Sequence, residues 1–116
     1  MAAFQTSQES GVNVLRITGK LDPFGWRDLK DIITSLTSES ADLLVDLSGL
    51  DFMASSGFRE LFLAGRSLAR NGRRLAVCGL QGEVKRVFEL AKFETAYPIF
   101  DSTEAALAWF QSGESR

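Results

Sequence analysis

The sequence predicts a single α/β domain with a mixed, mostly parallel sheet of four to five strands and about four helices packed against it. Short apolar runs of strand length alternate with longer segments in which apolar residues recur every three or four positions. Strands that alternate with helices need crossover connections, which make a sheet largely parallel. The length of 116 residues is that of one domain. We therefore expect residues 1–116 to form that domain, with residues 112–116 as a frayed tail.

The expected elements follow one another as two strands and then three helix–strand pairs, closed by a last helix. Strands are expected at 4–7, 12–18, 43–47, 75–79 and 97–100, and helices at 26–36, 57–69, 84–91 and after Asp101. Glu9-Ser10-Gly11 is typical of a hairpin turn, and Pro98 places the last strand at an edge. Asp101 with Glu104 resembles a capping box. We expect these residues in the core: Leu44, Val45, Leu47, Leu61, Phe62, Leu75, Val77, Val87 and Phe88.

The segment 43–58 organises the rest of the chain. Its apolar run Leu43–Leu47, bounded by Ser48-Gly49, is typical of a strand buried on both faces. A helical pattern starts directly after the small residues 54–57, so Ser55 and Ser56 are expected at a helix N-terminus beyond the carboxyl end of this strand. In open α/β sheets, ligands and partners dock at that rim.

Composition and charge narrow the classes of function. The formal net charge is −2, and basic residues alternate with acidic ones, so we expect no nucleic-acid partner. Cys78 is the single cysteine, which excludes an intrachain disulfide and fits a reducing compartment. The first residues resemble no secretory signal, and no apolar run is as long as a membrane span. We therefore expect a cytoplasmic protein without membrane insertion.

Residues of the common catalytic and metal sites are scarce. The chain has no His, and one Cys does not make a zinc site. No glycine-rich phosphate loop of standard spacing is present. Met53–Gly57 has some likeness to the nucleophile elbow of Ser hydrolases, but Met53 replaces its first Gly and no His could activate Ser55. We therefore expect no catalytic residue, no metal and no cofactor.

The pattern alone leaves two interpretations of Ser55 and Ser56. Either hydroxyl could cap the helix by accepting a bond from a first-turn N–H, a role worth roughly 1 kcal/mol, and this is the simpler interpretation. Gly57 would then allow the helix to pack closely on the strand. Alternatively the helix N-terminus is a functional site, because its N–H groups favour a negative charge.

Five segments resemble one family. Val45–Phe58, V-D-L-S-G-L-D-F-M-A-S-S-G-F, is similar to the signature of STAS domains, especially bacterial anti-sigma factor antagonists, which read Asp-Leu and then Asp-Ser-Ser-Gly-Leu at this spacing. Gly19–Asp22 matches their Gly-x-Leu-Asp after the second strand. Gly72–Leu75, Val84–Val87 and Ile99–Ser102 stand where the family has similar segments. The resemblance covers nearly the whole chain, and the order and spacing of the segments are more specific than any one of them.

The resemblance implies a partner-switching protein that is a binder and a kinase substrate rather than an enzyme. In the family, the unmodified antagonist binds an anti-sigma factor that is also a serine kinase, which frees the sigma factor. The kinase then phosphorylates the first Ser of the motif and so releases the antagonist, and a metal-dependent Ser/Thr phosphatase reverses the modification. By position that residue is Ser55, with Ser56 as the second choice.

Two positions depart from the family pattern. Ala54 replaces the usual Asp, which either weakens recognition by a kinase or marks a module that binds its partner constitutively, for example as an accessory subunit of a lipid-transport ATPase. Arg59 replaces a common Gly and could contact a phosphate on Ser55 or be a solvated helix charge.

The expected partner-binding residues are Asp22, Met53, Ala54, Ser55, Ser56, Gly57, Phe58 and Arg59. Of the two apolar flanking residues, we expect Phe58 rather than Met53 to be a core residue. Asp22 could also cap the first helix or begin a turn before it.

Overall fold

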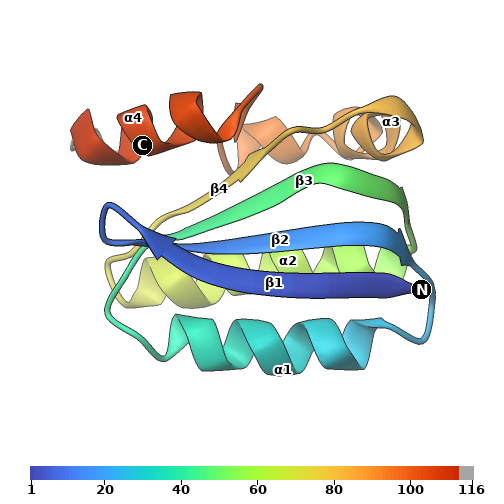
Figure 1. Cartoon of the computed structure of the whole chain (residues 1–116), viewed down its shortest axis with the longest axis horizontal. Coiled ribbons are helices and arrows are strands. Elements are labelled where there is room, and N and C mark those ends of the chain that lie inside the picture. The colour runs from blue at the N-terminus through green and yellow to red at the C-terminus, as the bar shows by residue number, and fades with distance from the viewer. Residues whose placement is uncertain (113–116) are drawn as a thin grey trace.

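The computed structural model describes residues 1–112, which form a five-stranded mixed sheet with helices on both sides (Figure 1). The elements in chain order are β1 (Ala2–Glu9), β2 (Val12–Leu21), α1 (Trp26–Thr37), β3 (Leu43–Met53), α2 (Ser55–Arg70), β4 (Leu75–Cys78), α3 (Gly82–Leu90), the 3-10 turn η1 (Phe93–Thr95), β5 (Ile99–Phe100) and α4 (Thr103–Ser112). The strands lie in the order β1-β2-β3-β4-β5, with β1 antiparallel to β2 and the other pairs parallel. The predicted fold class is confirmed.

The hairpin and the edge strand also follow the prediction. Ser10 and Gly11 form the loop between β1 and β2, with φ of 54° and 80°. A two-residue loop with positive φ at both positions matches the twist of the strands that it joins. β5 is the last strand of the sheet, as Pro98 indicated, although it is shorter than expected and begins at Ile99.

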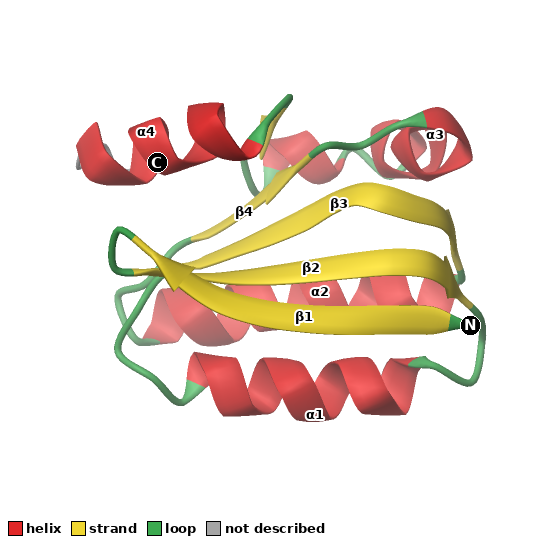
Figure 2. Ribbon diagram, viewed as in Figure 1, coloured by secondary structure: helices red, strands yellow, loops and turns green. Residues whose placement is uncertain are grey.

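The central strand is longer than its apolar run indicates. We expected it to end at Ser48 and Gly49, yet β3 continues to Met53. Two irregularities in its register with β2 carry the pairing past Gly49, so the small polar residues mark a bend within the strand rather than a turn. As a result β2 and β3 end side by side, with Leu21 opposite Met53. Figure 2 shows the segments that follow these two strands at the same end of the molecule.

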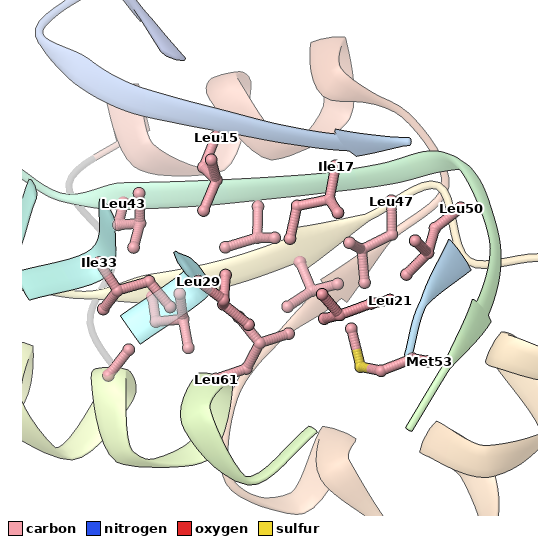
Figure 3. Close-up of a cluster of buried hydrophobic side chains, with 14 of the residues drawn as sticks. Leu15, Ile17, Leu21, Leu29, Ile33, Leu43, Leu47, Leu50, Met53 and Leu61 are labelled. Atoms are coloured by element: carbon pink, nitrogen blue, oxygen red, sulfur yellow. The ribbon is translucent and has the colours of Figure 1, made fainter. Parts of the chain in front are cut away.

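Two hydrophobic clusters hold the helices on the sheet. The larger cluster joins one face of the sheet to α1 and α2 and extends to α3 and η1. Figure 3 shows its centre, with Leu15, Ile17 and Leu21 of β2 facing Leu29 and Ile33 of α1. The smaller cluster lies under α4 and consists of Val12, Val14, Leu44, Ala76, Cys78, Ala106 and Phe110.

Seven of the nine predicted core residues are fully buried, and two predictions are wrong. Phe62 and Val87 are half-buried rather than interior. On α2 the buried face is centred on Leu61, Ala64 and Leu68, which leaves Phe62 at its border. On α3 only Val84 and Phe88 are buried, because the helix touches its neighbours along a narrow stripe.

The last helix begins with a different cap from the one expected. The Ala105 N–H donates to the Ser102 hydroxyl at 3.1 Å, so Ser102 is the cap and the predicted Asp101–Glu104 box does not form. Ser112 is the last residue of α4. The rest of the predicted frayed tail, 113–116, lies outside the described residues.

Candidate functional site

Ser55 is the first residue of α2 and is exposed to solvent. The residue before it, Ala54, has extended backbone angles of φ −70° and ψ 156° and forms the N-cap. The Ala54 N–H donates to the carbonyl of Leu21 at 2.8 Å, and the Ala54 carbonyl accepts from Gly57 and Phe58. The start of α2 is therefore fixed on both sides, by the end of β2 and by its own first turn.

The two serines differ sharply in their surroundings. Ser55 is exposed, whereas the Ser56 hydroxyl oxygen is buried and has no hydrogen-bond partner within residues 1–112. In the same part of the chain no side chain caps α2, since the N-cap residue is an alanine. The capping interpretation of Ser55 and Ser56 is therefore wrong. An exposed hydroxyl can meet an enzyme, whereas a buried one must first be uncovered.

Close packing around Leu21 sets the position of this helix start. An added Cβ at Gly57 would collide with the Leu21 side chain, and one at Gly25 would come within 2.7 Å of it. Leu21 thus lies between the beginnings of α1 and α2, where only glycines leave it room. Figure 3 shows Leu21 and Met53 close together near the ends of their strands. This contact holds the β2–α1 loop and the start of α2 in a fixed relation.

Asp22 shapes the loop between β2 and α1. Its carboxylate oxygen Oδ1 accepts from the Phe24 N–H at 2.9 Å, and its carbonyl accepts from the Gly25 N–H at 3.0 Å. These bonds make a turn, which confirms the interpretation of Asp22 as the start of a turn. The interpretation of Asp22 as a helix cap is wrong, because Gly25 is the N-cap of α1. The turn leaves Phe24 pointing outward with 86% of its surface exposed.

The structure divides the predicted partner-binding residues into buried and accessible groups. Met53, Ala54 and Gly57 are buried, so they shape the site from below. Ser55 and Arg59 are exposed. Asp22, Ser56 and Phe58 are partly exposed.

The expected order of burial between Phe58 and Met53 is reversed. Met53 is 5% exposed and belongs to the core, whereas Phe58 is partly exposed. The Phe58 ring packs edge-on against Phe88 at 5.0 Å and Phe93 at 5.5 Å between centroids. These contacts join the first turn of α2 to α3 and η1, while part of Phe58 stays exposed to solvent.

The start of α2 is electrostatically suited to a phosphate. Its first turn contains no acidic residue, and Arg59 follows Ser55 by one helical turn. A helix N-terminus stabilises negative charge through its free N–H groups and its dipole. A phosphate on Ser55 would thus be compatible with the fold.

Two exposed aromatic residues beside this site were missing from the predicted set. Phe24 stands in the Asp22 turn, and Phe52, three residues before Ser55, is 42% exposed. A signal existed for each of them. Phe24 is an apolar residue inside a turn sequence, Asp-Pro-Phe-Gly, and Phe52 lies between the polar Asp51 and the buried Met53 near a strand end.

Within residues 1–112, no helix is both long and apolar enough to span a membrane.

Comparison with known proteins identifies the family. Residues 3–106 match the STAS domain family. A Bordetella bronchiseptica protein named as a candidate anti-sigma factor antagonist, BtrV, is 34% identical over 74 residues, which are 64% of this chain and 64% of that protein. An anti-sigma factor antagonist from Mycobacterium paratuberculosis superposes with a TM-score of 0.86 at 21% identity, covering 93% of this chain and 92% of its own.

The Bacillus anti-sigma factor antagonist SpoIIAA has the same fold in two forms. Its unphosphorylated form superposes with a TM-score of 0.75 at 22% identity over 97% of this chain and 100% of its own. Its phosphorylated form superposes with a TM-score of 0.74 at 21% identity over 93% and 99%. These likenesses show the fold, and the match over residues 3–106 shows that the chain belongs to the STAS domain family.

Proposed function

We propose that this chain is an anti-sigma factor antagonist that binds an anti-sigma factor with serine kinase activity and is switched off by phosphorylation of Ser55. A metal-dependent Ser/Thr phosphatase would restore the binding form. In this role the chain is a cytoplasmic binder and a substrate with no catalytic activity of its own.

The observation that carries the proposal is the different exposure of two adjacent hydroxyls. Ser55 is exposed at the first position of α2, whereas the Ser56 oxygen is buried. A kinase must bring its phosphoryl donor in line with the acceptor oxygen, which requires access to that oxygen. Ser56 is also on the same face as Glu60, one helical turn further on, where a second negative charge would be repelled.

A phosphate on Ser55 would act on the partner rather than on the fold. It adds about −1.5 to −2 charge at neutral pH. The helix N-terminus accommodates that charge, so the domain stays folded. A partner docked over Ser55 would have to remove water from the phosphate, which weakens the complex. The switch therefore needs no conformational change in this chain.

The test uses the purified anti-sigma kinases of the source organism, titrated one at a time against wild-type protein and two variants. Ser55→Ala keeps the surface small and neutral, so it should bind as wild type does and accept no phosphate. Ser55→Asp should weaken binding by roughly 2 kcal/mol or more, because its carboxylate must be desolvated. Intact mass reports the phosphate, and circular dichroism shows that both variants are folded. Equal affinity of all three proteins would refute the switch.

Ala54 favours a second candidate, a STAS module that binds its partner constitutively. The family pattern has an Asp at this position, and the alanine offers neither a charge nor a side-chain cap to α2. Under this alternative the same surface binds a partner, for example an ATPase subunit, and no phosphate is gained during incubation with ATP and a kinase. Phosphate on Ser55 decides in favour of the first candidate.

A further inference from the structure

We propose that Phe24 is an aromatic anchor that inserts into an apolar pocket of the anti-sigma partner, with Phe52 as a second contact on the same surface. The inference rests on the proposed function and adds the residues that give the interface its affinity. It begins from Phe24, a large aromatic side chain in a turn, 86% of whose surface is exposed.

The turn requires its other residues but not Phe24. Asp22 supplies the carboxylate and carbonyl that accept the two hydrogen bonds, and Gly25 leaves room for Leu21. Position 24 contributes only its backbone N–H, so a polar residue would form the same turn. The phenyl ring, 86% exposed, therefore does not serve the fold of this domain.

The backbone that carries the ring is also held in place before any partner arrives. Asp22 accepts hydrogen bonds from the N–H groups of Phe24 and Gly25, which fix the backbone of the turn, and Pro23 restricts the preceding φ angle. A group that is already ordered loses little conformational entropy on binding. Aromatic residues at interface centres contribute a large share of affinity for this reason and because of their size.

The position of Phe24 connects it to Ser55. Leu21, three residues earlier, is wedged against Gly57 in the first turn of α2, and its carbonyl holds Ala54. On the neighbouring strand, Phe52 is paired in register with Lys20 of β2. The loop with Phe24, the end of β3 with Phe52 and the exposed Ser55 thus belong to the same rim of the sheet. A partner that covers Ser55 meets this rim.

A shallow hollow beside Phe24 supports a docking role. Its volume is about 160 Å³, and its lining includes the apolar Phe4, Leu21 and Phe24 as well as the charged Lys20 and Asp28. An apolar side chain of the partner can enter this hollow and pack against Phe24. A ring that projects next to a hollow is a surface that interlocks with a partner, as interface centres do.

The test measures affinity for the purified anti-sigma kinases of the source organism, one kinase at a time, in the absence of ATP. The variants are Phe24→Ala and Phe52→Ala. The controls are Leu90→Ala on α3 and Leu63→Ala further along α2, which remove exposed apolar side chains of 72% and 39% exposure. Urea unfolding of each variant shows that its fold is unchanged, as expected for exposed side chains.

We expect Phe24→Ala to weaken binding at least about tenfold, Phe52→Ala to weaken it less, and both leucine variants to stay within about twofold of wild type. If wild type binds tightly and the affinity of Phe24→Ala is within twofold of it, the anchor is refuted and the proposed function still stands. Equal losses in all four variants would also refute it. A wild-type dimer that Phe24→Ala converts to monomer, seen by sedimentation, would assign the ring to a second copy of the chain instead. If no kinase binds the wild type, the proposed function fails and the anchor fails with it.

Discussion

Arg16 on β2 and Asp46 on β3 form an ion pair on the face of the sheet that α4 covers, with Nε 2.9 Å from Oδ2. Asp46 is 4% exposed, and its other oxygen accepts from the backbone N–H of Ser48 at 3.0 Å. Thr103, at the start of α4, donates to the same carboxylate at 3.4 Å. Asp46 therefore ties two strands, the bend after Asp46 in β3 and the last helix into one polar network.

This network predicts a loss of stability in acid. Burial alone would raise the pKa of Asp46, but hydrogen bonds from Ser48 and Arg16 and the charge of Arg16 outweigh it and hold the pKa below its ordinary value of 3.8. A depressed folded-state pKa gives stability that is complete above the unfolded-state pKa and is lost as the pH falls through the folded value. We expect the urea concentration at the unfolding midpoint of wild type to decrease once the pH is lowered below about 4.

The variant Asp46→Asn separates this carboxylate from the other acidic groups. It should cost about 1–3 kcal/mol at pH 7, since the partly buried Arg16 loses its partner, and its urea midpoint should fall less than that of wild type between pH 5 and pH 3. Parallel curves for the two proteins over that range would show that Asp46 does not contribute to the acid transition.

The contact between Leu21 and Gly57 predicts a coupled pair of substitutions. Gly57→Ala would normally favour a helix by roughly 1 kcal/mol. Here the added methyl collides with Leu21, so we expect a net loss of about 1–3 kcal/mol. In a Leu21→Ala background the collision is removed and only Met53 Cγ, at 3.3 Å, remains close to the added methyl, so the same change should cost much less. Chemical unfolding of the four proteins of this cycle gives the coupling energy, and additive effects would mean that the two residues do not touch.

The sequence predicts more of the fold than of the site, and particular residues explain why. Alternating apolar and helical patterns reveal which segments are strands and helices, because they reflect burial directly. They do not reveal which of Ser55 and Ser56 is exposed, because that depends on how α2 is rotated about its axis against Leu21 and Met53. Nor do they reveal that β3 passes Gly49, because a bulge is specified by the partner strand.

Phe24 is the clearest case of a residue that the pattern could not place. The turn formed by Asp22 was one of two alternatives in the sequence, and in this turn the aromatic ring that follows lies in solvent. A resemblance to a family points to positions that its members share. It cannot identify a side chain that belongs to one member's own interface.

The aromatic cluster behind the site predicts a contrast between two phenylalanines. Phe93 is fully buried and contacts the rings of Phe58, Phe62, Phe88 and Tyr97, so Phe93→Ala should cost about 3–5 kcal/mol. Phe62 is half-buried at the border of the same cluster. Phe62→Ala should therefore cost less. Urea unfolding compares the two, and a larger loss for Phe62 would mean that α2 presents a different face to the sheet.

The N-cap of α2 supports a last prediction, which separates capping from charge. Ala54 has the extended backbone angles of an N-cap but a side chain that cannot accept a hydrogen bond. Both Ala54→Asp and Ala54→Asn provide an acceptor for a first-turn N–H, so each should stabilise the domain by about 1 kcal/mol. Only Ala54→Asp adds a negative charge, which the dipole of α2 stabilises further at pH 7 and not at pH 3.

The same two variants test what the missing carboxylate means for the switch. If a kinase recognises the charge next to Ser55, Ala54→Asp should be phosphorylated faster than wild type, and Ala54→Asn should resemble wild type. If the kinase requires only a well-ordered helix start, the two variants should be faster by the same factor. Initial rates of phosphate incorporation, followed by intact mass, distinguish these results, and Ser55→Ala in each background confirms the site. No gain in unfolding free energy for Ala54→Asn would show that the first-turn N–H groups of α2 do not donate to a side chain at position 54.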